Sequence, residues 1–253
     1  MIADERKQQI LELLSKNGTV KVTDLSQLFD VSEVTIRTYL ADMENKGLLS
    51  RIHGGAVSSY KPYYSMNMNQ RLETNHSQKL KIAEIVSTMI NPNDTIMLNS
   101  GTTTLLAFRK FPAEYPLNIV TNSISIALEA SDNPNYNVIL IGGSINKKYQ
   151  FSYGVDAIKQ LQNYHADKLI LSVDGIDPDN GFSTYYDKES EIDRVMIEQS
   201  DCCIIVADNT KFYHTAFAKI SDIDVADCII TNEPPTDEFL KRFSELGIDV
   251  LIT

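Results

Sequence analysis

The stretch that most constrains the fold spans residues 31–56, VSEVTIRTYLADMENKGLLSRIHGGA. Ser32 is a good helix N-cap, because its hydroxyl can accept hydrogen bonds from the first amides of a helix. The apolar positions that follow at helical spacing are Ile36, Leu40 and Met43. Gly47 is a typical helix stop. The pattern predicts a helix that packs one face on a small core and leaves its polar N-terminal residues exposed.

A short hairpin should follow this helix. Two short arms, residues 50–53 and 56–57, flank Gly54-Gly55, and this arrangement predicts a β-hairpin. A helix that can enter the major groove, followed by a two-stranded ribbon, is a winged helix-turn-helix. The candidate DNA contacts are Ser32, Glu33, Thr35, Arg37, Thr38 and Tyr39 on the helix, with Arg51 and His53 on the hairpin. The alternative is a winged helix that binds proteins.

Two more helices and a strand should complete this domain. The first helix is predicted over residues 4–16, and a second helix should be capped by Thr23 with Asp24. Residues 19–22 form a short extended piece that can pair with the hairpin. We therefore predict a DNA-binding domain over residues 1–58.

A linker and a larger domain follow. Residues 59–76 show no hydrophobic period and contain tyrosines that we expect to pack on a domain rather than stack on bases: Tyr60, Tyr63 and Tyr64. From residue 77 to 253, short β-branched strands alternate with helical patterns. This alternation indicates a largely parallel sheet covered on both faces, and the fold class is therefore α/β with three layers.

Composition limits the function further. The formal net charge of −11 argues against non-specific nucleic-acid binding by the whole surface, although residues 45–72 contain basic residues and no acid. No apolar run approaches the roughly 20 residues of a membrane span, and the first residues lack a signal-peptide pattern, so we expect a cytoplasmic protein that does not bind membranes. The cysteines, at 202, 203 and 228, lack the spacing of a metal site, and we expect neither a metal nor a cofactor.

The loops after the predicted strands carry the second candidate site. Ligands of open α/β sheets bind beyond the carboxyl ends of the strands. The candidate residues are Ser100, Gly101, Thr102, Thr103, Thr104, Thr121, Asn122, Ser123, Gly142, Gly143, Asp174, Gly175, Asp177, Glu189 and Lys211. Helix-start amides and Lys211 suit phosphate, and carboxylates and Asn suit hydroxyls. Each loop alone could equally be an ordinary turn or helix cap.

Two groups of motifs carry a resemblance to a known family. VSxxTIR followed by GLLxRxHGGA resembles the signature of the DeoR (GlpR-type) family of bacterial transcriptional regulators. SGTTT, TNS, GG, DGID and ADxxK resemble the effector-domain motifs of the same family, so the resemblance runs from about residue 5 to residue 211. One departure is that Thr38 and Tyr39 follow TIR, where the family usually has Arg-Asp, which leaves fewer charges facing the groove.

The resemblance implies a fold and a function. The effector domain of this family is similar in fold to ribose-5-phosphate isomerase, glucosamine-6-phosphate deaminase and CoA transferases. The resemblance further implies a repressor of a sugar, amino-sugar or sugar-alcohol operon that a phosphorylated sugar releases from operator DNA. A single reading helix makes a small interface, so we expect a homodimer or tetramer that reads paired half-sites.

The resemblance also raises an enzymatic alternative, a sugar-phosphate isomerase or deaminase with a DNA-binding arm. Residues 100–103 resemble the isomerase phosphate loop, residues 174–177 resemble its active-site string, and Glu189 falls where the isomerase has a carboxylate. The isomerase also has a lysine in a following glycine-rich loop, where this chain has residues 181–186, GFSTYY. Because that lysine is missing, we predict ligand binding without turnover and no enzyme activity.

Overall fold

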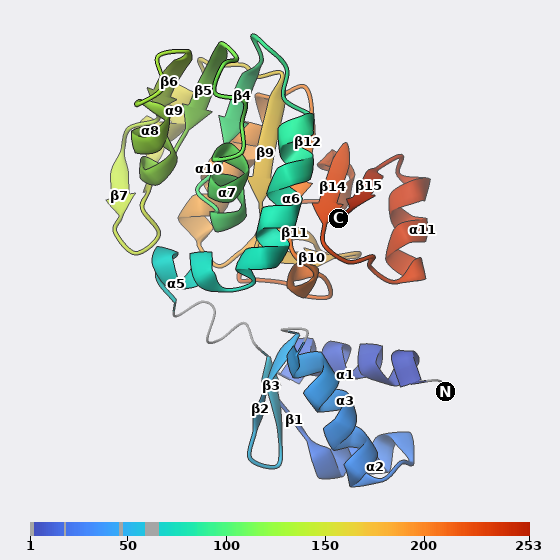
Figure 1. Ribbon diagram of the computed structural model, residues 1–253. Helices are drawn as coiled ribbons and strands as arrows, with labels where there is room; N and C mark the ends of the chain where they lie inside the picture. The colour runs from blue at the N-terminus through green and yellow to red at the C-terminus, as the bar shows by residue number, and fades with distance from the viewer. Residues whose placement is uncertain (1–2, 18, 46–47, 59–65) are drawn as a thin grey trace. The chain divides into compact units, whose positions relative to one another are not determined.

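The computed structural model describes residues 3–17, 19–45, 48–58 and 66–253. The chain divides into two units, Met1–Met66 and Asn67–Thr253 (Figure 1). Each unit has its own buried hydrophobic residues. The predicted helix end at Gly47 and the predicted packing of Tyr60, Tyr63 and Tyr64 lie outside the described residues.

The first unit contains three helices and a three-stranded sheet. Its elements are α1 (Ala3–Asn17), β1 (Thr19–Lys21), α2 (Val22–Phe29), α3 (Glu33–Asn45), β2 (Leu49–Ile52) and β3 (Gly55–Ser58). The strands pair antiparallel in the order β1-β3-β2, so the extended piece joins the hairpin as predicted. Ile36, Leu40 and Met43 are buried in the core, as their helical spacing predicted.

The start of α2 differs from the prediction. Val22 already belongs to the helix and is buried in the core. Thr23 and Asp24 therefore lie in the first turn, where the Thr23 hydroxyl donates to the Asp24 carboxylate at 3.0 Å. Burial of an apolar residue at the helix start, rather than a polar cap, sets this boundary.

The turn of the hairpin also differs from the prediction. Gly54 is in the turn with a φ of 80°, but Gly55 begins β3. A Cβ on Gly55 would lie 2.1 Å from the carbonyl oxygen of Val20 in β1. Gly55 is therefore needed for the close approach of β1 and β3, and not for the turn.

A seven-stranded parallel sheet organises the second unit (Figure 1). Its strands are β4 (Thr95–Leu98), β5 (Leu117–Thr121), β6 (Tyr136–Leu140), β9 (Lys168–Ser172), β12 (Cys203–Val206), β14 (Cys228–Thr231) and β15 (Asp249–Ile252). Their spatial order is β15-β14-β12-β9-β4-β5-β6, and all neighbours are parallel. The order reverses between β4 and β9, which makes their carboxyl ends the switch point where such sheets bind ligands.

Helices cover both faces of this sheet. One face packs against α6 (His76–Thr88), α7 (Thr102–Phe108) and α8 (Ile124–Ala130). The other packs against α9 (Val155–Leu161), α10 (Asp187–Glu198) and α11 (Asp237–Glu245). Successive strand residues alternate between the two cores, as Ile96 and Met97 do in β4. The predicted three-layer α/β domain is confirmed.

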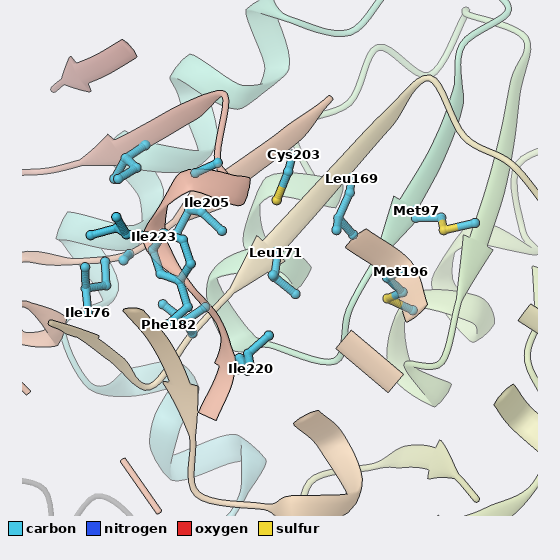
Figure 2. Close-up of a cluster of buried hydrophobic side chains, with 14 of the residues drawn as sticks. Met97, Leu169, Leu171, Ile176, Phe182, Met196, Cys203, Ile205, Ile220 and Ile223 are labelled. Carbon is cyan, nitrogen blue, oxygen red and sulfur yellow. The ribbon is translucent and has the colours of Figure 1, made fainter. Parts of the chain in front are cut away.

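Figure 2 shows one of these cores in detail. Leu169 and Leu171 of β9 and Cys203 and Ile205 of β12 lie on the same face as Met196 of α10. All five side chains are almost completely buried. The face is continuous across neighbouring strands, and it holds the carboxyl ends of these strands in fixed positions.

Smaller elements surround the edge of the main sheet. A second, antiparallel sheet has the order β10 (Gly175–Asp177), β11 (Gly181–Thr184) and β13 (Ala218–Ser221). Other small elements are the hairpin β7 (Ser144–Asn146) and β8 (Phe151–Tyr153) and the 3₁₀ helices η1 (Asn209–Lys211) and η2 (Ile223–Val225). The sequence pattern predicted loops at residues 175–177 and 181–184. Because β11 is buried along its whole length, it shows no polar–apolar alternation.

Residues 67–76, which were predicted to belong to a linker, are part of the second unit. The second unit begins at Asn67, which caps helix α5 (Met68–Glu73) in a reciprocal pair with Gln70. Met68 and Arg71 are the buried residues of this helix. An arginine on the buried face obscures the hydrophobic period, so the sequence pattern did not reveal α5.

Candidate functional site

Helix α3 exposes charged side chains away from its core. The Ser32 hydroxyl accepts from the backbone N–H of Thr35 at 3.1 Å, which confirms the predicted N-cap. Arg37 and Glu33 form an ion pair of 2.6 Å one turn apart, with side chains 55% and 43% exposed. Because both side chains are already in contact with solvent, either one can bind a ligand without the free-energy cost of breaking a buried interaction.

The same helix differs from the prediction at two positions. Val34 is 70% exposed, and we did not predict it as a contact although it lies outside the apolar stripe. Tyr39 packs against the core, and its hydroxyl lies 3.4 Å from the guanidinium of Arg6 on α1. The ammonium of Lys7 lies 5.8 Å from the centroid of the Tyr39 ring. The structure thus places Tyr39 against α1 and not among the exposed candidates, while Thr38 remains exposed.

Arg51 connects the hairpin to helix α3. Its backbone N–H and its Nε donate to the two carboxylate oxygens of Glu44 at 2.8 and 2.6 Å. The backbone hydrogen bond from Arg51, followed by its guanidinium, lowers the pKa of Glu44. Arg51 remains about half exposed, and His53 is exposed in the turn. Arg51 therefore positions the hairpin in addition to offering a cation.

In the second unit, Asn99 joins four elements at the switch point. It follows β4 and is buried; its amide nitrogen donates to the Ser172 carbonyl at 2.9 Å and to Asp193 of α10 at 3.3 Å. Its amide oxygen accepts from the hydroxyl of Thr104 in α7 at 2.9 Å and from the Ser172 N–H at 3.0 Å. The predicted Thr104 thus supports the site through Asn99, which was not among the predicted site residues.

The loop between β4 and α7 lies directly on β9. A Cβ on Gly101 would lie 1.4 Å from the hydroxyl of Ser172, so this close approach requires glycine. Ser100 donates to the Glu189 carboxylate at 2.8 Å. Thr102 and Thr103 are buried in the first turn of α7. The structure therefore brings the predicted residues 100–104 and Glu189 together at the switch point.

Three carboxylates gather beside this loop: Asp174 and Asp193 are buried, and Glu189 is partly buried. Asp174 accepts from the Tyr185 N–H at 3.2 Å, and the Thr184 hydroxyl lies 3.3 Å from Asp174 and 2.6 Å from Glu189. Burial, and then the negative charge of Asp174, raise the pKa of Glu189. Burial, and then the negative charge of Glu189, raise the pKa of Asp193 well above its ordinary value. The cluster is therefore electrostatically crowded and suited to groups that donate hydrogen bonds.

Arg71 of α5 supplies a cation that we did not predict. Its Nη1 lies 3.3 Å from Asp174, and the two side chains are only 11% and 10% exposed. Its Nη2 donates to the Tyr149 hydroxyl at 3.3 Å, and its guanidinium carbon lies 4.3 Å from the centroid of that ring. Burial alone would raise the pKa of Asp174, but the charges of Arg71 and Lys211, together with the hydrogen bonds from Tyr185 and Thr184, outweigh burial and lower it.

Lys211 acts on the same carboxylate. It lies in η1, after β12, and is buried. Burial, and then the positive charge of Lys211, lower the pKa of His214 to about 4. The Nε2 of His214 lies 2.9 Å from the Tyr185 hydroxyl. Two cations from distant parts of the sequence, Arg71 and Lys211, therefore stabilise the charge of Asp174.

The predicted residues after β5 serve mainly to hold the sheet edge together. The Thr121 hydroxyl donates to the Leu98 carbonyl at 2.7 Å, and the Ser123 hydroxyl caps α8. The amide nitrogen of Asn122 donates to the Ser152 carbonyl at 3.3 Å. All three side chains are buried.

The predicted glycines after β6 allow close packing. Gly143 has a φ of 147°, and a Cβ there would lie 2.5 Å from the carbonyl oxygen of Tyr153. The Gly142 N–H donates to the Gln160 side chain at 3.0 Å. These contacts hold the hairpin β7–β8 against α9.

Asp177 does not join Asp174, although the two are separated by only two residues. Its carboxylate accepts from the backbone N–H groups of Asp179 at 3.0 Å and Asn180 at 2.8 Å, so it shapes the turn between β10 and β11. A Cβ on Gly175 would lie 2.4 Å from the His214 carbonyl oxygen. Gly175 therefore permits the packing of β10 next to the site.

The described part of the chain contains neither a metal cluster nor a membrane span. Within residues 3–17, 19–45, 48–58 and 66–253, no group of three His, Cys, Asp or Glu side chains is arranged to hold a metal ion. No helix in those ranges is long and apolar enough to cross a membrane. Cys202, Cys203 and Cys228 are free thiols, and the last two are buried.

Comparisons with solved structures concern only the fold. Ribose-5-phosphate isomerase A from Methanocaldococcus jannaschii is 14% identical, with a TM-score of 0.41, and the match covers 55% of each chain. The delta subunit of eIF2B from Chaetomium thermophilum is 13% identical with a TM-score of 0.41, and the match covers 61% of this chain and 58% of that one.

Sequence comparisons identify the family. A protein of Escherichia coli O157:H7, named as a candidate aga operon transcriptional repressor, is 33% identical over 98% of this chain and 93% of its own length. The regulator GolR of Listeria innocua is 30% identical over 100% and 99%, and the repressor GlcR of Bacillus subtilis is 28% identical over 100% and 97%. The DeoR-like helix-turn-helix domain matches residues 6–61, and the DeoR C-terminal sensor domain matches residues 74–233. The chain therefore belongs to the DeoR family of DNA-binding transcriptional regulators, and its second unit is a sensor domain.

Proposed function

We propose that this protein represses a carbohydrate-use operon and leaves its operator when a phosphorylated sugar binds the sensor domain. The observation that carries this proposal is the buried ion pair of Asp174 with Arg71 at the switch point, where the positive charge of Lys211 also acts on Asp174. Buried charged side chains lower stability unless they are paired or bind a ligand. A stable fold rarely needs several of them at one edge of a sheet. The names of the relatives, which include a candidate repressor of the aga operon, support the role of a transcriptional repressor.

The chemistry of the site favours a phosphorylated sugar. Ser100 and the carboxylates of Asp174 and Glu189 can exchange hydrogen bonds with sugar hydroxyls. Arg71 and Lys211 supply positive charge for a phosphate, and guanidinium groups bind phosphate with two parallel hydrogen bonds. A neutral sugar would leave that positive charge unused, so we expect weaker binding of the free sugar than of its phosphate.

Helix α3 would read the operator in the major groove. The guanidinium of Arg37 suits guanine, and the exposed Val34 suits the methyl group of thymine. Glu33, Thr35 and Thr38 are further candidates for base edges, and Arg51 and His53 are candidates for the DNA backbone. One such helix buries a small interface, so we propose a dimer or tetramer that reads paired half-sites. In this proposal, residues 1–58 bind DNA, and the sensor domain binds the effector and forms the oligomer.

The direct test measures operator binding and release together. Fluorescence anisotropy would follow the full chain on DNA from upstream of its own gene, titrated with ribose 5-phosphate, glucose 6-phosphate, fructose 1-phosphate and N-acetylglucosamine 6-phosphate. We expect one phosphosugar to reverse specific binding and its free sugar to leave binding unchanged. Binding that none of a wider set of phosphosugars alters would contradict the effector class, and absence of specific DNA binding would contradict the repressor role.

A further inference from the structure

The corner between α5 and α6 is attached to two carboxylates that follow neighbouring strands of the main sheet. Arg71 in α5 pairs with Asp174, which follows β9. Asn75, just before α6, donates from its side-chain amide to Asp208, which follows β12, at 3.3 Å. Since β9 and β12 are neighbouring strands, both contacts lie at the same edge of the sheet. The corner is therefore held by the groups that a ligand at this edge would contact.

Further polar contacts hold this corner, beside the apolar packing of Met68. The ammonium of Lys79 is completely buried and donates to the Arg71 carbonyl oxygen at 2.6 Å. The Met68 N–H donates to the Lys148 carbonyl oxygen at 3.2 Å. Arg71 itself stacks on the ring of Tyr149, the next residue after Lys148. Directional contacts of this kind hold α5 in one arrangement, and a change in one partner alters the hydrogen bonds of the others.

The position of α5 in the chain gives these contacts a consequence. The first unit ends at Met66, and α5 begins at Met68, so it is the first element of the sensor domain. A ligand can shift an equilibrium between two arrangements only if its contacts differ between them. Arg71 is well placed to make such a contact, because its guanidinium now binds a carboxylate and can instead bind a phosphate.

We propose that Arg71 is an effector-contacting residue and that it transmits occupancy of the site to the DNA-binding unit. This inference rests on the proposed function and specifies how the site is regulated. An anionic ligand beside Asp174 competes for the guanidinium of Arg71, while Lys211 and the hydroxyls of the ligand satisfy Asp174. The attachment of α5, the element that follows the DNA-binding unit in the chain, then differs between the empty and the occupied site.

The test compares three variants of the full chain. Arg71→Gln removes the cation, Tyr149→Phe removes only the hydroxyl that accepts from Arg71, and Arg109→Gln breaks an exposed ion pair with Glu129 in the same unit. Operator release by the active phosphosugar is measured for each. We expect the half-release concentration to rise roughly ten- to a hundredfold in Arg71→Gln, because charge-assisted hydrogen bonds contribute that much to binding. It should rise less in Tyr149→Phe and stay unchanged in Arg109→Gln.

Release of Arg71→Gln at the wild-type concentration would overturn the proposal. A merely structural role of Arg71 would lower the melting temperature without raising the half-release concentration, and this result would overturn it as well. If Arg71→Gln does not fold, Tyr149→Phe decides: a raised half-release concentration supports the proposal, and a wild-type value opposes it.

A second measurement separates this inference from the proposed function. If no phosphosugar releases the wild-type protein, the proposed effector class fails, and amide hydrogen exchange of the ligand-free protein then tests the transmission. Faster exchange over residues 67–75 together with altered operator affinity in Arg71→Gln would support transmission through α5. Unchanged operator affinity would overturn it.

Discussion

The two units contain the same kind of ion pair in opposite surroundings. Arg37 and Glu33 in the DNA-binding unit lie 2.6 Å apart with about half of each side chain exposed. Arg71 and Asp174 in the sensor domain lie 3.3 Å apart with about a tenth of each side chain exposed. The exposed pair is the shorter one, yet water screens it and little free energy is lost when it separates. Distance alone is therefore a poor guide to the importance of an ion pair.

The difference separates two kinds of function. The exposed Arg37 can exchange its carboxylate for DNA with little change in its own domain. The buried Arg71 cannot lose Asp174 without leaving an uncompensated charge inside the protein. We therefore expect changes at the first pair to alter affinity for a ligand, and changes at the second to alter the fold and its response to a ligand.

The largest expected effect is the loss of the buried cation. Replacing Arg71 with Met should lower the free energy of unfolding by about 3–5 kcal/mol, because Asp174 remains buried without that partner. Urea denaturation followed by tyrosine fluorescence measures the change. The double variant R71M/D174N removes both charges and should recover most of the loss. A single variant as stable as the wild type would show that the pair is not effectively buried.

A buried histidine should make the sensor domain sensitive to acid. The pKa of His214 is lowered to about 4 from an ordinary value near 6.5. Between these values the unfolded chain binds a proton that the folded protein does not, so stability is lost as the pH falls from 6.5 to 4. The variant His214→Gln should remove up to about 3 kcal/mol of this loss. Urea denaturation at several pH values checks the slope, and an equal slope in both proteins would contradict the assignment.

The close approach of β1 and β3 should be sensitive to a single methyl group. Replacing Gly55 with Ala places a Cβ 2.1 Å from the carbonyl oxygen of Val20. The strands must separate, which should cost about 1–3 kcal/mol and weaken operator binding. Gly54→Asn is the matched control, because Gly54 has open space around it and asparagine tolerates its positive φ. Thermal unfolding and anisotropy on operator DNA would detect the difference, and equal behaviour of both variants would contradict it.

Local patterns predicted much of the architecture. The spacing of Ile36, Leu40 and Met43 identified the core face of α3, and the cap at Ser32 identified its start. Alternating helices and β-branched strands predicted the parallel sheet, because buried parallel strands need a helix between them. The polar loops after β4 and β9 were correctly predicted to lie at one edge, because the carboxyl ends of neighbouring parallel strands meet at the same edge of a sheet.

The parts of the sites that the sequence did not predict depend on contacts between residues that are distant in the sequence. Arg71 pairs with a residue 103 positions later, and nothing near it in the sequence indicates a buried partner. Asp177 was grouped with Asp174, but the turn that it shapes carries its side chain to other partners. Tyr39 was assigned to the exposed face, and only its contacts with α1 show otherwise. Local spacing cannot reveal these choices, because tertiary packing decides them.

The smallest expected effect on stability concerns the exposed pair. Replacing Arg37 with Ala should change the free energy of unfolding by only about 0.3–0.5 kcal/mol, as for other pairs one helical turn apart. Operator affinity should nevertheless fall by about 1–3 kcal/mol if the guanidinium reads a base. Arg109→Ala, which breaks another solvent-exposed pair in the sensor domain, should leave operator affinity unchanged. Anisotropy at several salt concentrations distinguishes two roles of Arg37. If its guanidinium binds a base, the salt slope of the variant stays nearly that of the wild type, whereas if it binds a phosphate the slope falls by about one. Wild-type affinity in Arg37→Ala at every salt concentration would remove Arg37 from the DNA-binding surface.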